Sequence, residues 1–121
     1  MPYDQLVENN LKMGKFALTP EVMEMVAERF KALAEPARLQ LLNCLQGGEL
    51  TVNELVEETG LGQANVSKHL QLLHSLGFVT RRKEGLFVYY AIADASVFRL
   101  CDIMCGRIQA QLSTRGRRFA S

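Results

Sequence analysis

The fold is decided by residues 51–77, whose sequence is TVNELVEETGLGQANVSKHLQLLHSLG. The stretch opens on a capping box, because the Thr51 hydroxyl and the Glu54 carboxylate are spaced to satisfy the first free N–H groups of a helix. That helix is short and ends at Thr59-Gly60. A second helix is predicted over about 63–76, because four apolar residues recur at helical spacing: Val66, Leu70, Leu73 and Leu76. The stretch therefore predicts two helices joined by a tight turn.

Strand-like sequence follows these helices. Phe78–Arg82 and Phe87–Ile92 are rich in β-branched and aromatic residues, and residues 83–86 between them contain the turn residue Gly85. A β-hairpin is therefore predicted. Asp94 then caps a last helix, which carries an apolar stripe of six residues: Val97, Leu100, Cys101, Met104, Ile108 and Leu112.

Two further helices precede the quoted stretch. The first starts at Thr19-Pro20, because Thr is a good N-cap and Pro is tolerated at the first helical position. One face of it carries Val22, Val26, Phe30 and Leu33. Glu35-Pro36 ends this helix and opens the next. The predicted stripe of that second helix is Leu39, Leu42 and Leu45, widened by Leu41.

These elements predict a mainly α fold with a small β-hairpin, arranged as a winged helix-turn-helix domain over residues 19–112. Residues 1–18 form a leader in which Leu6, Val7, Leu11 and Phe16 could build a short helix. Residues 113–121 form a basic C-terminal tail. The length of 121 residues and the apolar content of 48% suit one compact domain.

Composition excludes several classes of protein. No apolar run approaches the roughly 18 residues that a membrane-spanning helix needs, and the N-terminus lacks a signal-peptide pattern. A cytoplasmic location is therefore expected. Three cysteines are too few and too unevenly spaced for a disulfide scaffold, so we expect them to stay reduced.

The net charge of +1 conceals a division between the two halves of the chain. Residues 1–61 hold five basic and ten acidic side chains, whereas residues 62–121 hold nine basic and three acidic ones. Residues 62–83 contain four Lys or Arg side chains and no acid. A local basic surface of this kind is typical of proteins that bind nucleic acid.

The polar face of the helix over 63–76 has the chemistry to read base pairs. Asn and Gln can pair with adenine in the major groove, Lys can donate to guanine, and Ser can contact bases or phosphates. The hairpin adds basic side chains where a wing would follow the DNA backbone. The predicted DNA-binding residues are Gln63, Ala64, Asn65, Ser67, Lys68, His69, Gln71, Arg81, Arg82 and Lys83.

Two other classes of function compete with DNA binding. A winged helix can serve as a protein-interaction module, in which case Arg81, Arg82 and Lys83 would not contribute to binding. An enzyme is not expected, because the chain has no glycine-rich phosphate loop and no Ser/His/Asp arrangement that spacing would favour.

Four segments resemble the ArsR/SmtB family of bacterial transcriptional repressors: Phe30–Leu42, Glu49–Leu55, Gln63–Leu73 and Gly85–Tyr90. The resemblance covers roughly residues 22–112. It implies a winged-helix homodimer, built through the first and last helices, that binds an inverted-repeat operator on double-stranded DNA. It also implies that an effector, typically a metal ion, releases the operator.

The chain departs from this family at its usual metal ligands. Where the family has Glu-Leu-Cys-Val-Cys-Asp-Leu, this chain has Thr51 and Asn53 in place of both cysteines. The family's other site uses Asp-x-His and a second His on the last helix, but Asp94 is followed by Ala95-Ser96 and no His lies beyond His74. None of the usual family ligands is therefore present. His69 is expected to pack between helices or to contact phosphate rather than to bind metal.

The three cysteines remain as possible sensing residues. Cys101 and Cys105 are four residues apart and share one face of the last helix, and Cys44 lies near the end of the second helix. Three converging thiolates could bind As(III) or another soft metal ion. A redox or sulfur switch and a purely structural role are the alternatives, because free Cys often packs as a small hydrophobic residue. With structural cysteines the protein would bind DNA constitutively.

Overall fold

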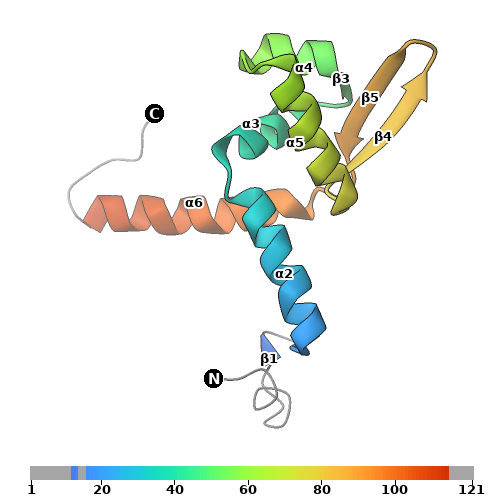
Figure 1. Cartoon of the computed structure of the whole chain (residues 1–121). Helices are drawn as coiled ribbons and strands as arrows, with labels where there is room; N and C mark the ends of the chain where they lie inside the picture. The colour runs from blue at the N-terminus through green and yellow to red at the C-terminus, as the bar shows by residue number, and fades with distance from the viewer. Residues whose placement is uncertain (1–11, 14–15, 115–121) are drawn as a thin grey trace.

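The computed structural model describes residues 12–13 and 16–114, and it is a mainly helical fold with a small antiparallel sheet (Figure 1). The helices are α2 (Pro20–Leu33), α3 (Pro36–Leu45), α4 (Val52–Thr59), α5 (Gln63–Ser75) and α6 (Ser96–Thr114). The strands are β1 (Lys12–Met13), β2 (Phe16–Ala17), β3 (Leu50–Thr51), β4 (Val79–Glu84) and β5 (Phe87–Ile92). The predicted fold class is confirmed.

The N-terminal leader differs from the prediction where it can be described. β1 and β2 pair with each other as two short antiparallel strands, so Phe16 lies in a strand rather than in a short helix. Leu6, Val7 and Leu11 lie outside the described residues.

Local capping chemistry sets the helix starts as the sequence predicts. The Thr19 hydroxyl accepts a hydrogen bond from the Val22 N–H at 3.2 Å, and Pro20 is the first residue of α2. In the capping box, Thr51 Oγ1 accepts from the Glu54 N–H at 3.2 Å while Glu54 Oε1 accepts from the Thr51 N–H at 3.0 Å. The helix ends agree within two residues, since α5 stops at Ser75 and α6 continues to Thr114.

The core lies where α3, α4 and α5 meet the sheet. Its buried side chains are Leu41, Leu42, Leu45, Leu55, Val66, Leu70, Leu73, Val79, Tyr90 and Val97. The prediction for α3 was wrong in one detail, because Leu39 is 39% exposed whereas Leu41 is fully buried. The reason is tertiary: α3 contacts α2, α4, α5 and β5, so its buried arc is wider than one periodic stripe and centres on Leu41 and Leu42.

The sheet has the order β3-β5-β4, and β3 is a strand that the sequence analysis missed. Leu50 and Thr51 pair with Tyr90 and Tyr89 of β5. The hairpin turn is also tighter than predicted, because β4 runs on through Lys83 and Glu84 and only Gly85 and Leu86 form the turn. A two-residue hairpin turn needs a positive φ, and Gly85 supplies it at 62°.

The helices α2 and α6 extend away from this core in Figure 1. Most of their apolar residues stay exposed in the single chain, including Phe30 at 54%, Ile103 at 67% and Met104 at 62%. The predicted stripe of α2 is therefore largely unburied, since only Ala32 of this helix is buried. Within the described residues, no helix has both the length and the apolar character needed to cross a membrane.

Candidate nucleic-acid interface

The turn between α4 and α5 is fixed by short-range hydrogen bonds. Gly60 ends α4 with φ at 73°, a conformation that suits glycine, and its N–H donates to the Val56 carbonyl at 2.9 Å. The Thr59 hydroxyl donates to the Leu55 carbonyl at 2.7 Å and accepts from the Leu61 N–H at 3.2 Å. The short helix α4 therefore holds the start of α5 in a defined place.

The two faces of α5 differ sharply in environment. Val66, Leu70 and Leu73 are fully buried. The opposite face begins in the first turn of the helix and is mostly polar: Gln63, Asn65, Lys68 and Gln71 are exposed together with Ala64, and Ser67 is half-buried. The first turn of α5 contains no acidic residue. This arrangement presents hydrogen-bond donors and acceptors to solvent on a helix whose other side is anchored in the core.

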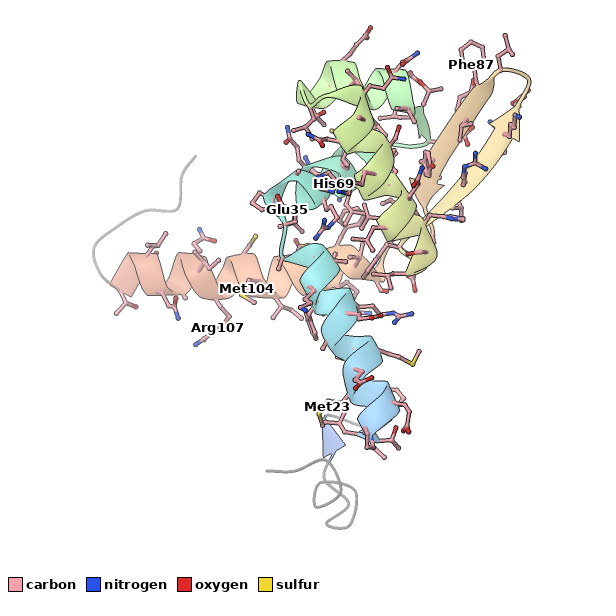
Figure 2. All side chains as sticks on the ribbon, viewed as in Figure 1. Met23, Glu35, His69, Phe87, Met104 and Arg107 are labelled. Carbon is pink, nitrogen blue, oxygen red and sulfur yellow. The ribbon has the colours of Figure 1, made fainter. Side chains whose placement is uncertain are left out.

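His69 lies apart from this polar face, on the side of α5 toward α3 (Figure 2). It is half-buried, and its Nδ1 atom lies 3.2 Å from Nη1 of Arg38. His69 therefore contacts the neighbouring helix α3 through Arg38.

The wing separates its three predicted basic residues. Along β4, side chains alternate between faces, so Arg81 and Lys83 share the face of the buried Val79 while Arg82 points to the other face. The Arg82 guanidinium forms ion pairs with Glu49, at 2.7 Å, and with Glu84. It also stacks over the Tyr89 ring at 4.6 Å from the ring centroid. Hydrogen bonds from Arg82 to these two carboxylates raise the pKa of Arg82 further above its ordinary value.

Comparison with known proteins finds a family of regulators whose sequences resemble this chain. Residues 35–81 match the model of a family described as "Bacterial regulatory protein, arsR family". A transcriptional repressor SmtB homolog from Synechocystis is 40% identical over 95 residues, a match that covers 74% of this chain and 72% of that protein. The chain belongs to the ArsR family.

Other relatives give the same assignment. A protein named as a probable mercury resistance operon repressor from Streptomyces lividans is 40% identical over 74 residues, which span 61% of this chain and 59% of that protein. The crystal structure of the transcriptional repressor BigR from Xylella fastidiosa superposes with a TM-score of 0.60 at 33% identity, covering 72% of this chain and 93% of that one. This ArsR-family chain is therefore a DNA-binding transcriptional regulator with a winged helix-turn-helix fold, and not an enzyme.

The cysteines of this ArsR-family chain do not converge. Cys44 packs half-buried against the core, whereas Cys101 is half-buried and Cys105 exposed on α6. Burial and, to a lesser degree, the negative charge of Glu58 raise the pKa of the Cys44 thiol. Across residues 12–13 and 16–114, no group of three or more His, Cys, Asp or Glu side chains could hold a metal ion. A three-thiolate site, one of the alternatives left open by the sequence, is therefore not formed by the described residues of one chain.

Three residues around the site were missed by the sequence analysis. Arg38, Glu49 and Tyr89 contact predicted DNA-binding residues, and the partners His69 and Arg82 lie 31 and 33 residues away from Arg38 and Glu49. Arg38 and Glu49 stand inside the segments that carry the family resemblance, and that was the one available signal for them.

Proposed function

We propose that the first half of α5 reads operator DNA in the major groove while the wing contacts the phosphate backbone. The observation that supports this most is the anchoring of α5: Val66, Leu70 and Leu73 are fully buried while the opposite face is exposed and polar. A helix held this way loses little conformational entropy when its Asn, Gln and Lys side chains meet base edges. The proposed contacts are Gln63, Ala64, Asn65, Ser67, Lys68, Gln71, Arg81 and Lys83. His69 and Arg82, which the sequence analysis also named as DNA-binding residues, are proposed instead to position the helix and the wing.

The surroundings of these residues favour different roles for them. Lys68 is exposed on the polar face of α5, and Arg81 and Lys83 are exposed on β4. The charge of Arg82 is already balanced by Glu49 and Glu84, so we propose that Arg82 mainly braces the wing. His69 has its Nδ1 atom engaged by Arg38, which favours a packing role over a base contact.

The decisive experiment measures sequence discrimination. Fluorescence anisotropy compares a 30-bp duplex taken from the DNA upstream of the protein's own gene with a random duplex of the same length. Asn65→Ala is expected to lower discrimination by about 1–3 kcal/mol, because a bidentate contact to adenine is lost. Asn43→Ala, at an exposed position of α3, is the matched control and should change nothing. A wild-type protein that binds both duplexes equally would refute sequence-specific binding.

We propose further that the protein acts as a homodimer on an inverted repeat. The support is the exposed apolar surface of α2 and α6, on which Met25, Phe30, Ile103 and Met104 are all more than half exposed. A second copy would cover this surface, and the two reading helices would then engage half-sites about one helical turn apart, ~34–36 Å. A cytoplasmic location, where operator DNA is accessible, completes this proposal.

The proposed trigger is a thiophilic metalloid or a redox or sulfur species that acts on the α6 cysteines. Cys105 is exposed and Cys101 half-buried on the same helix that carries the proposed dimer surface, so modification there would alter the packing of two copies. Two thiolates do not complete a soft-metal site, so a third ligand would come from the second copy. The similarity to a protein named for mercury resistance supports a soft metal.

A constitutive regulator with structural cysteines is the second candidate, favoured by the half-buried Cys44 and its raised pKa. Titrating the DNA complex with As(III), Zn(II), polysulfide and diamide separates the two. Release of DNA that is abolished in Cys101→Ser or Cys105→Ser supports the switch. Unchanged affinity with every reagent supports the constitutive regulator.

A further inference from the structure

The Arg38 side chain joins three helices through one guanidinium. Arg38 lies in the first turn of α3 and is half-buried. Its Nε donates to the Ala32 carbonyl at 2.6 Å, and its Nη2 donates to the Lys31 carbonyl at 3.3 Å. Both acceptors belong to the last turn of α2. Arg38 therefore ties α3 to the C-terminal end of the preceding helix.

The Ala32 carbonyl needs such a partner because of the local sequence. In a continuing helix this oxygen would accept from the N–H four residues later, but that residue is Pro36, which has no N–H. Ala32 is also buried, at 2% exposure, which limits its access to water. An unpartnered buried carbonyl would be destabilising. The 2.6 Å hydrogen bond from Arg38 replaces the backbone donor that Pro36 lacks.

The third donor of the same guanidinium reaches the reading helix. Arg38 Nη1 lies 3.2 Å from His69 Nδ1, and both side chains are half-buried. A guanidinium can only donate, so this contact is a hydrogen bond when Nδ1 of His69 accepts and the ring proton lies on Nε2. In Figure 2 the His69 label marks this junction between α5 and α3.

We infer that Arg38 is a positioning residue that sets the angle of the reading helix α5 relative to α2 by holding His69. The inference deepens the proposed function and rests on it: α2 contributes to the proposed dimer surface, and α5 carries the proposed base contacts. One rigid, planar group with three used donors links the two, so a change in the position of α2 reaches α5 through Arg38. Each of the three guanidinium nitrogens of Arg38 makes a contact within the protein, so its proposed role is positioning rather than base contact.

The test is a double-mutant cycle with a rescue variant. Arg38→Gln and His69→Leu each remove the contact between the two side chains, and the double variant loses the same single contact. His69→Asn restores an acceptor oxygen close to the position of Nδ1. Affinity is measured by anisotropy on the upstream duplex and on the random duplex at several salt concentrations. Arg29→Gln is the matched control, because Arg29 hydrogen-bonds only to the Met25 carbonyl of its own helix among the described contacts.

Each single variant should weaken binding to the upstream duplex roughly tenfold, and the double variant no further. His69→Asn and Arg29→Gln should bind like the wild type. The affinity for the random duplex and the slope against salt should stay unchanged, since no phosphate contact is removed. The ¹⁵N shifts of the His69 ring should report the Nε2–H form in the wild type and lose this preference in Arg38→Gln.

Additive losses in the double variant would mean that His69 contacts DNA directly and would overturn the inference. Equal losses on both duplexes would overturn it too, because they indicate general destabilisation. If Arg38→Gln does not fold, His69→Leu against His69→Asn decides between loss and rescue. Failure of the proposed function looks different: there the wild type itself would not distinguish the two duplexes.

Discussion

The helix-turn-helix unit and the pair of helices α2 and α6 bury their apolar residues to very different extents. Helices α3, α4 and α5 supply seven side chains that are almost completely inaccessible. In contrast, the 19-residue helix α6 buries only Val97, and α2 buries only Ala32. The difference teaches that the proposed DNA-reading unit completes its core within one chain, whereas α2 and α6 expose the apolar surface that we propose a second copy covers.

The largest expected effect tests the first half of this comparison. Leu70→Ala removes a fully buried side chain of α5, so the free energy of unfolding should fall by about 2–5 kcal/mol. Leu86→Ala is the matched control, because Leu86 is 97% exposed at the hairpin turn and its loss should change stability by less than about 0.5 kcal/mol. Urea denaturation followed by circular dichroism measures both. Similar losses in the two variants would contradict the proposed division.

The second prediction tests the surface of α6. Met104→Glu places a charge on the exposed apolar face, and burying that charge between two copies should raise the dimer dissociation constant at least ~100-fold. Sedimentation equilibrium measures the constant. Gln109→Glu introduces the same charge at an exposed polar position of the same helix and should leave the dimer intact. A monomeric wild type, or a Met104→Glu dimer as tight as the wild type, would reject α6 as the interface.

The third prediction compares two basic residues of the wing. Arg81→Ala should reduce the slope of log affinity against log salt by about 1, because one phosphate contact is lost. Arg82→Ala should change the slope less, because Glu49 and Glu84 already neutralise its charge. Anisotropy titrations at salt concentrations between about 50 and 200 mM measure the slopes of both variants. Equal changes in slope would show that Arg82 leaves its carboxylates to contact DNA.

The fourth prediction concerns the start of α4, which supports α5. Thr51→Ala removes the hydroxyl that caps this helix and should lower the free energy of unfolding by about 1 kcal/mol. Thermal unfolding measures the loss. Asn53→Ala, exposed in the first turn of the same helix, serves as the control. A larger loss of stability in Asn53→Ala than in Thr51→Ala would contradict the stabilising role of the Thr51 cap.

The last prediction concerns the reactivity of the three cysteines and involves no change in stability. Iodoacetamide should modify Cys105 fastest, Cys101 next and Cys44 slowest, as peptide mass spectrometry can follow. Cys105 is exposed, whereas Cys44 is half-buried with a raised thiol pKa and so forms little of the reactive thiolate at neutral pH. The rate at Cys44 should rise with pH as the thiolate forms. Faster modification of Cys44 than of Cys105 would place the accessible thiol in the reading unit instead of on α6.

Much of the secondary structure could be predicted because its causes are local. The Thr19 cap, the Thr51/Glu54 capping box and the glycines after α4 and α5 act within four residues, and the helix boundaries agree with them closely. The errors arose where distant segments meet. Strand β3 exists only because Leu50 and Thr51 pair with Tyr90 and Tyr89 of β5, which lie 40 and 38 residues later in the chain. No local pattern marks a two-residue strand.

The candidate site shows the same division. The polar face of α5 follows directly from the spacing of Val66, Leu70 and Leu73, so its exposed residues could be named from the sequence. The surroundings of Arg82 could not, because alternation along β4 and the approach of Glu49 together decide that its charge is paired. The cysteines followed the same rule: their number and spacing were readable, but whether they converge was not.

The sequence by itself determined the helices, the hairpin, the buried face of the reading helix and the resemblance to a family of repressors. It could do so because periodicity, capping and turn formation depend on residues a few positions apart. Only the tertiary structure decided that Leu41 and not Leu39 is buried, that Arg82 faces two carboxylates, and that Arg38 holds His69. These outcomes depend on which segments pack together, and that packing is set by the whole core rather than by any one stretch of the chain.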